Sequence, residues 1–215
     1  MGAYISVNHV TKKFKEATVL NDVNVEFKKA EIHGLIGQNG SGKTMLMKCI
    51  CGLVPITTGT IIINQKQIGK DIQIPDNIGA IIETPGFLPS YSGYQNLLFL
   101  SKVKGTISKE QIKQSIRKVG LNPEDKKPVG KYSLGMRQRL GLAQAIMENP
   151  ELLILDEPMN GFDKDGVSDM RKYLLNLKEQ GKTILIASHS TEDIEILCDT
   201  VCEMDKGVLT KLKGW

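Results

Sequence analysis

The sequence contains no apolar run approaching the roughly 18 residues that a membrane-crossing helix needs. No basic segment followed by an apolar stretch begins the chain, so we expect no secretory signal. If the protein works at a membrane, another chain must therefore cross it. Aromatic residues make up only 5% of the chain. None of them interrupts the basic stretch from Lys102 to Lys131, and a nucleic-acid partner is therefore not expected.

Cysteine is also scarce, with four in 215 residues, at positions 49, 51, 198 and 202. Neither pair has the C-x-x-C spacing of a zinc or redox site, and no nearby histidine completes a metal-binding set. We therefore expect buried free thiols in a reducing compartment.

Acidic residues are few in one part of the chain. Residues 102–131 contain nine Lys/Arg and only three Asp/Glu. Such an excess is typical of a solvated helical face. It also suits a surface that attracts anionic lipid headgroups or an acidic partner, and the sequence leaves both readings open.

Short apolar runs alternate with helix-like segments along most of the chain. The runs at 32–36, 78–82, 152–155 and 183–187 predict buried strands, and weaker alternation in the first thirty residues predicts short strands. Helices are expected at 45–50, 94–103, 108–119, 136–147, 166–179 and 191–197, and a closing hairpin at 200–204 and 207–209. This alternation predicts an α/β fold, with a mainly parallel sheet and helices on both faces.

The segment from about 84 to 147 is predicted to be helical and to contain no strand. We interpret it as an insertion rather than a second independent domain. Residues 1–215 are therefore expected to form a single domain, whose α/β core comprises about 1–83 and 148–215.

One motif is more informative than the rest: Gly37-Gln38-Asn39-Gly40-Ser41-Gly42-Lys43-Thr44, which has the pattern G-x-x-x-x-G-K-[ST]. It follows an apolar strand and precedes a helix, and this context makes the motif specific. The glycines let the backbone point N–H groups at an anion, and the helix start adds positive charge. Lys43 is expected to reach the β and γ phosphates of a nucleotide, and the Thr44 hydroxyl to bind Mg²⁺.

Two adjacent acids, Asp156 and Glu157, follow the apolar run at 152–155. A carboxylate at the end of a strand beside a phosphate loop can hold Mg²⁺ through its water shell, which is the role expected of Asp156. Glu157 would then point at the γ-phosphate and orient or deprotonate a water molecule.

A third segment, Tyr132-Ser133-Leu134-Gly135-Met136, begins a predicted helix. Backbone N–H groups at a helix start, together with a serine hydroxyl, suit a phosphate. A serine there is equally suited to capping the helix with no ligand present, so this segment alone leaves both roles open.

With these motifs in this order, the chain from about residue 4 to 210 resembles the ATP-binding (nucleotide-binding) subunit of an ABC (ATP-binding cassette) transporter. The resemblance makes the phosphate loop Walker A and the 152–157 segment Walker B, with Glu157 as the catalytic glutamate. It further implies that Phe14 stacks on adenine and that Ser133 and Gly135 belong to the signature loop. Asp163 matches the acid of the D-loop, and His189 matches the switch histidine at the γ-phosphate.

Two departures from the family pattern stand out. Glu83 lies where the family usually carries a glutamine that senses Mg²⁺ and the membrane partner. The signature segment keeps only the serine and the second glycine of Leu-Ser-Gly-Gly-Gln, and Met136 cannot supply the hydrogen bonds of glutamine. Together with Ile82-Glu83-Thr84-Pro85, this segment resembles the ATPase subunits of bacterial exporters that handle bacitracin, lantibiotics and similar antimicrobial peptides.

The resemblance also implies a P-loop NTPase (RecA-like) core with an N-terminal antiparallel β subdomain and an inserted helical signature subdomain. Two cassettes, identical or different, would enclose two ATP molecules head to tail, with Mg²⁺. A multi-pass membrane permease on a separate chain would hold the subunit at the cytoplasmic face of the membrane as a peripheral protein. Phe87, Leu88 and Tyr91, in the loop from residue 83 to 93, would either line a groove for the permease or form a small local core.

Other ATP- or GTP-dependent classes fit less well. A GTPase needs an Asn-Lys-x-Asp motif, which the sequence lacks. A small-molecule kinase need not carry the signature segment. The alternative is an ABC-type ATPase that acts on a soluble partner, although translation factors of that kind carry two cassettes and chromosome-type ones carry long coiled coils.

Overall fold

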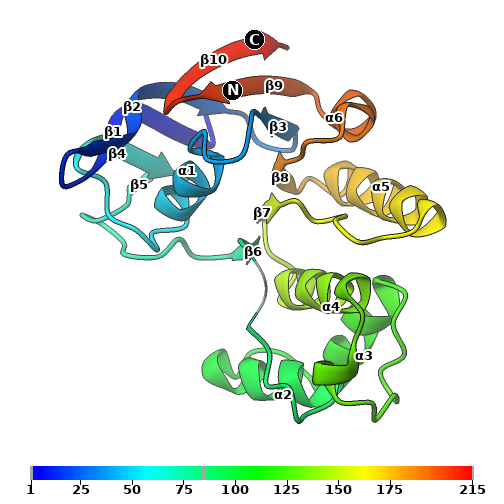
Figure 1. The fold of residues 1–215 in the computed structure, drawn as a ribbon. Helices are drawn as coiled ribbons and strands as arrows, with labels where there is room; N and C mark the ends of the chain where they lie inside the picture. The colour runs from blue at the N-terminus through cyan, green and yellow to red at the C-terminus, as the bar shows by residue number, and fades with distance from the viewer. Residues whose placement is uncertain (1, 84–85, 215) are drawn as a thin grey trace.

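The computed structural model describes residues 2–83 and 86–214, and its elements form two sheets flanked by helices (Figure 1). An antiparallel sheet has the strand order β2-β1-β4-β5. Its strands are β1 (Ile5–Phe14), β2 (Ala17–Phe27), β4 (Thr58–Ile63) and β5 (Lys66–Gln67). The sequence did not reveal β5.

The expectation of several short strands in the first thirty residues is wrong, because β1 and β2 are long and pair with each other over most of their length. The register of this pair shifts after Val7 and again after Val10. His9 and Asp22 lie at these irregularities with positive φ angles of 50° and 49°. Such bulges break the alternation of apolar and polar residues by which a long strand is recognised in a sequence.

The second sheet has the order β10-β9-β3-β8-β7-β6. Its strands are β3 (Ile32–Ile36), β6 (Ile78–Ile81), β7 (Leu152–Asp156), β8 (Thr183–Ala187), β9 (Thr200–Asp205) and β10 (Val208–Lys213). All neighbours pair in parallel except β9 and β10, which form the predicted hairpin. The mainly parallel sheet is thus confirmed. β6 is an edge strand, however, and half-buried Ile78 and Ala80 contradict the expected burial on both faces.

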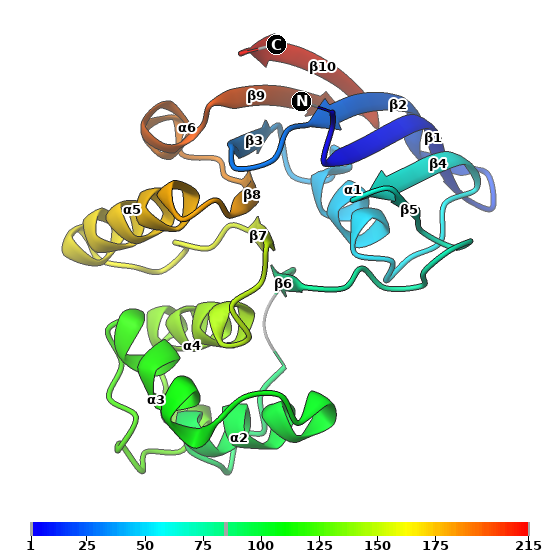
Figure 2. The same cartoon turned by 180° about the vertical axis from the view of Figure 1, so that it is seen from behind.

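Three helices accompany the parallel sheet: α1 (Lys43–Ile50), α5 (Lys164–Glu179) and α6 (Thr191–Leu197). The others are α2 (Gly93–Lys104), α3 (Lys109–Lys118) and α4 (Leu134–Ile146), with a 3-10 turn, η1, at Val129–Lys131. Figures 1 and 2 show α2, α3 and α4 gathered on one side of the sheets, next to the end of β6. The division of the chain near residues 83 and 148 stays a prediction that this arrangement supports.

The core explains why the elements pack in this order. Alternate residues of a strand point to opposite faces of the sheet. Leu153 and Leu155 of β7 join a buried cluster with α3, α4, α5 and α6, whereas Leu152 and Ile154 join a second cluster with α1 and the antiparallel sheet. The central strands are therefore covered on both faces, and their C-terminal ends are held rigidly at one edge.

The four cysteines are free and buried, as expected. Burial raises the pKa of Cys49 to about 11 and the pKa values of Cys51, Cys198 and Cys202 to about 12. Because the thiolate is the reactive form, these thiols are poor nucleophiles at neutral pH.

Candidate functional site

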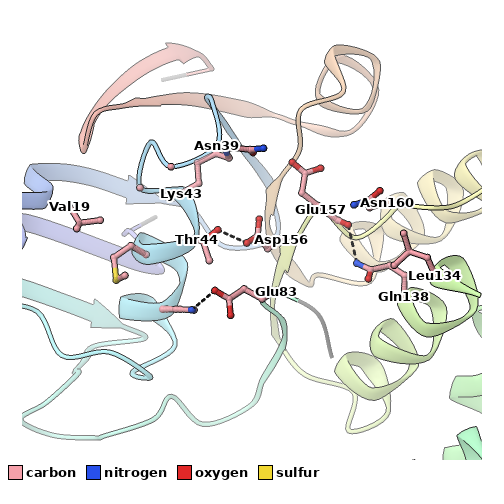
Figure 3. A pocket seen from close by; sticks show the side chains of 14 residues that line it. Val19, Asn39, Lys43, Thr44, Glu83, Leu134, Gln138, Asp156, Glu157 and Asn160 are labelled. Atoms are coloured by element: carbon pink, nitrogen blue, oxygen red, sulfur yellow. Dashed lines mark hydrogen bonds and ion pairs between the residues drawn. The ribbon is translucent and has the colours of Figure 1, made fainter. Parts of the chain in front are cut away.

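The parallel strands β3, β7 and β8 bring three loops to the same sheet edge, where ligands bind in folds of this class. A cavity of about 460 Å³ opens there (Figure 3). Its walls come from β2, the phosphate loop and α1, the end of β6, the start of α4 and the segment after β7. The lining residues are Val19, Asn39, Gly40, Gly42, Lys43, Thr44, Met45, Lys48, Glu83, Leu134, Gln138, Asp156, Glu157 and Asn160.

The phosphate loop has the shape that its glycines predict. Gly37, Gly40 and Gly42 have φ angles of 139°, 80° and 114°, which only glycine adopts readily. At Gly37 a Cβ would also overlap the carbonyl oxygen of Met204. Gly42 precedes α1 and supplies no side-chain cap, so the first N–H groups of the helix remain available to an anion.

The side chain of Lys43 crosses the phosphate loop. Its ammonium group donates hydrogen bonds to the carbonyl oxygens of Gly37 at 2.6 Å and Gln38 at 3.0 Å, and the residue is only 6% exposed. Ser41 is equally buried, and its hydroxyl is one of two buried side-chain atoms in the described chain that lack a hydrogen-bond partner. A bound phosphate fits such a cradle, since it would supply the missing acceptor.

A hydroxyl and a carboxylate meet at the next corner of the cavity. The Thr44 hydroxyl donates to Asp156 Oδ2 at 2.7 Å (Figure 3). Within the described residues, no group of three or more His, Cys, Asp or Glu side chains could hold a metal ion. Two protein oxygens beside a phosphate loop suit Mg²⁺, which keeps several waters and takes its other ligands from the nucleotide.

Glu83 reaches the same cavity, and its Oε1 lies 2.6 Å from the ammonium group of Lys48 on α1 (Figure 3). A positive charge from the protein therefore offsets the negative charge of Glu83, which stands where the family usually carries a neutral glutamine. Sequence reasoning missed Lys48, although it lies four residues after Thr44 and hence on the same face of α1. The neighbouring Thr84 and Pro85 lie outside the described residues.

This pair yields a prediction about Mg²⁺. In Lys48→Met the Glu83 carboxylate loses its counter-charge and repels a triphosphate more strongly unless Mg²⁺ is present. Because the pair is partly exposed, we expect the ratio of ATP dissociation constants without and with Mg²⁺ to rise only about threefold. Nucleotide titrations in Mg²⁺ and in EDTA measure this ratio. Lys48→Met/Glu83→Gln should restore it, and an unchanged ratio in Lys48→Met would exclude the compensation.

Glu157 lines this cavity and also a neighbouring one of about 730 Å³, where it meets His189. Glu157 Oε2 lies 2.8 Å from His189 Nδ1, and the two side chains come from the loops after β7 and β8. Glu157 has a φ of 49°, an unusual value for a residue other than glycine. Its N–H donates to the carbonyl of Ala187, which ties it to the adjacent strand. The histidine side chain is 74% exposed, and the glutamate side chain is 27% exposed.

The signature segment lies at the start of α4. The Ser133 hydroxyl accepts from the N–H of Met136 at 3.2 Å, so the serine caps the helix. Its O–H is still free to donate, and the residue is exposed and does not line the cavity. Leu134 lines the cavity, and Gly135 packs so tightly that a Cβ would overlap the carbonyl oxygen of Gly161. Capping is therefore observed, and phosphate contact by Ser133 and Gly135 stays a prediction.

Two predicted residues lie away from the cavity. Phe14 ends β1, is 47% exposed, and has the Lys12 ammonium group 4.5 Å from its ring centroid. Its stacking on adenine stays a prediction, and Val19 is the residue of this sheet that lines the cavity. Asp163 caps α5 by accepting from the N–H of Gly166 at 3.1 Å, and its side chain is 79% exposed.

Comparison with known proteins decides the family. The sequence profile of the ABC transporter family matches residues 20–160. The chain belongs to the ABC transporter family. As a member it is an ATP-binding ATPase, and the α/β P-loop fold expected from the sequence is confirmed.

Individual relatives show which group of ABC proteins the chain resembles. The chain is 47% identical to an uncharacterized ABC transporter ATP-binding protein, YybJ, of Bacillus subtilis, over 95% of this chain and 94% of that one. It is 43% identical to the bacitracin transport ATP-binding protein BcrA of Enterococcus faecalis, over 96% of this chain and 68% of that one. Identity to the lantibiotic transport ATP-binding protein SrtF of Streptococcus pyogenes is 38%, over 92% and 85%. The resemblance to this group of ABC proteins is thus confirmed.

Solved structures agree on the fold. The dimeric ATP-binding cassette MJ0796 bound to ADP and Pi superimposes with a TM-score of 0.86 at 22% identity, over 98% of this ABC protein and 99% of that chain. No helix within residues 2–83 and 86–214 of the present chain has the length and apolar character needed to cross a membrane.

Proposed function

We propose that the protein is the ATP-hydrolysing subunit of a transporter that exports an antimicrobial peptide through a permease on a separate chain. One observation carries the enzymatic part: a single cavity collects the phosphate loop, the Thr44–Asp156 pair and Glu157. The carboxylate of Glu157 is paired with His189, which lines a neighbouring cavity. The names of the bacitracin and lantibiotic relatives support the choice of substrate class.

ATP binding would begin at the phosphate loop. The β and γ phosphates occupy the cradle above Gly40 and Gly42, where backbone N–H groups point inward, and Lys43 exchanges carbonyl partners for phosphate oxygens. Thr44 and Asp156 would hold Mg²⁺, which neutralises charge on the phosphates.

Hydrolysis would use Glu157 as the general base. Its carboxylate takes a proton from a water molecule whose oxygen bonds to the γ-phosphorus, while the bond from that phosphorus to the β–γ bridging oxygen breaks and ADP leaves. A His189 tautomer with a proton on Nδ1 donates to the carboxylate and fixes its direction, as the 2.8 Å separation allows. Donation from the other ring nitrogen, Nε2, to a γ-phosphate oxygen would require a proton on that nitrogen as well.

A second cassette would complete the site. Ser133 is exposed at the N-terminus of α4 and does not line the cavity of its own chain, which suits contact with a nucleotide on a partner. In this arrangement ATP favours the closed pair because it contacts both chains, and loss of the γ-phosphate favours opening. Membrane attachment on the cytoplasmic face follows from the same proposal.

Permease contact would use a groove of about 250 Å³ between the end of β6, α2 and α4. Leu100 of α2 and Ile82 line it, and Leu100 is 39% exposed. The loop from residue 86 to 92 forms part of a local core. Phe87 packs against the buried cluster that contains Leu153 and Leu155, and the rings of Tyr91 and Phe99 meet edge-on with their centroids 5.0 Å apart. A groove that offers apolar side chains such as Ile82 and Leu100 suits a short amphipathic helix of the permease.

Leu100→Glu tests this groove. We expect it to abolish co-purification of the permease from membranes and resistance to the exported peptide, because a charge cannot be buried unpaired against the partner helix. Basal ATP hydrolysis should be unchanged. Val103→Glu, one turn further along α2 at a residue that is 83% exposed and outside the groove, is the matched control. Normal permease recovery and resistance with Leu100→Glu would exclude the groove as the docking site.

A further inference from the structure

The backbone of Glu157 is held in an unfavourable conformation. A φ of 49° places this residue in the left-handed region, where a side chain with a Cβ is strained. Such a conformation persists only where surrounding contacts enforce it. The contacts that enforce it here also decide where the carboxylate points.

Three hydrogen bonds fix the two peptide groups of Glu157. Its N–H donates to the carbonyl of Ala187 at 2.9 Å, and its own carbonyl accepts from the N–H of Asn160 at 3.2 Å. The same carbonyl accepts from Gln138 Nε2 at 3.0 Å, and Gln138 is only 7% exposed (Figure 3). Gln138 is the one side chain among these three partners, so its contribution can be removed by substitution.

Gln138 lies on the face of α4 that packs against the segment from Glu157 to Asp163. Leu134, Gly135, Gln138 and Arg139 are spaced i, i+1, i+4 and i+5, which puts them on one side of a helix. Leu134 and Gly135 both pack against Gly161, so closely that a Cβ at Gly161 would stand 3.0 Å from Leu134 Cγ.

Arg139 holds the far end of the same segment. Its guanidinium group lies 4.5 Å from the ring centroid of Phe162 and 3.5 Å from the Asp163 carboxylate. A second nitrogen of the group donates to the carbonyl of Val119 at the end of α3. The segment from Glu157 to Asp163 is therefore held at both ends by adjacent side chains of α4.

We propose that Gln138 is a positioning residue for Glu157: its hydrogen bond keeps the strained backbone in place and thereby aims the carboxylate into the cavity. The inference rests on the proposed function, in which Glu157 is the general base. It also gives α4 two tasks, since the helix that presents Ser133 to a partner's nucleotide holds the base of its own site through Gln138. Any displacement of α4 would therefore also displace the hydrolytic group.

Gln138→Met tests the proposal, because methionine fills a similar volume without donating a hydrogen bond. We expect kcat to fall on the order of 10- to 100-fold, as for a displacement of a catalytic group by about 1 Å. The ATP dissociation constant should stay within twofold, because the phosphate loop is untouched. Gln114→Met, at an exposed residue of α3, is the matched control and should keep native turnover. If Gln138→Met fails to bind ATP, Gln138→Asn, one methylene shorter, takes its place.

A double variant separates positioning from general damage. In the Glu157→Gln background, Gln138→Met should cause no further loss in single-turnover rate, because the group that it positions is already absent. Losses that multiply would show that Gln138 acts elsewhere and would overturn the inference. So would native kcat in Gln138→Met alongside an inactive Glu157→Gln. If Glu157→Gln itself turns over at the native rate, the proposed role of Glu157 fails instead.

Discussion

Glu157→Gln is expected to bind ATP normally and to hydrolyse it about 10²–10⁴-fold more slowly than the native protein. The amide cannot take a proton from the attacking water. The amide oxygen can still accept a hydrogen bond from His189 Nδ1, as Glu157 Oε2 does at 2.8 Å. The substitution therefore keeps the position of the side chain and removes its ability to act as a base. Steady-state turnover and nucleotide titration together measure the two quantities.

The matched control for this substitution is Glu151→Gln. Glu151 lies at the opposite end of β7, where it pairs with Lys29 at 3.1 Å, far along the strand from the cavity. The Glu151→Gln variant should keep native turnover. Equal activities of Glu157→Gln and Glu151→Gln would remove Glu157 from the role of general base.

Lys43→Met should weaken ATP binding on the order of 10- to 100-fold, which corresponds to the loss of a hydrogen bond to a charged group. Two lysines line the cavity, and Lys48 is engaged with Glu83, so Lys43 is the one whose charge is available to the phosphates. Its present partners are neutral carbonyl oxygens, which it can exchange for phosphate oxygens. Methionine keeps an unbranched side chain of similar length and removes both the charge and the hydrogen-bond donors.

Titration with a fluorescent ATP analogue measures this effect. Lys48→Met provides the contrast, since removal of that lysine should change mainly the Mg²⁺ dependence and by only about threefold. If Lys43→Met and Lys48→Met weaken ATP binding equally, the nucleotide is attracted by the overall positive charge of the cavity and not by direct contact with Lys43.

The parts of the site that are local in the chain were predictable. The phosphate loop, Asp156 and Glu157 follow apolar strands directly, and parallel strands bring their C-terminal ends to one edge. The capping box of Ser108 and Gln111 at the start of α3 is likewise a pattern of residues three positions apart, and the structure contains it. Such features depend on residues a few positions apart, and the sequence displays them.

Features that depend on distant segments were not predictable. Lys48 and Glu83 are 35 residues apart, and Gln138 and Glu157 are 19 apart, so their pairing depends on how the helices pack. The positive φ of Glu157 has no signal in the residue type, because such strain is imposed by the surroundings. The roles of Phe14, Ser133 and Asp163 involve a nucleotide or a second chain, so they stay predictions.

The central claim is that ATP bridges two copies of this fold, with the phosphate loop of one facing the start of α4 of the other. Asn39 and Leu134 are exposed residues at these two places, and both line the cavity of their own chain. A crosslink between these two positions within one chain therefore has to be prevented. One preparation should carry Asn39→Cys and the other Leu134→Cys, both in the Glu157→Gln background, so that any crosslink between introduced cysteines joins two molecules.

Crosslinking of this mixture by a short bifunctional thiol reagent is the most direct measurement. The four native cysteines are buried, with pKa values raised to about 11 or 12, and will react slowly. We predict rapid formation of a covalent dimer with Mg²⁺ and ATP, and little with ADP or without nucleotide. A yield that is the same with and without ATP would contradict the account.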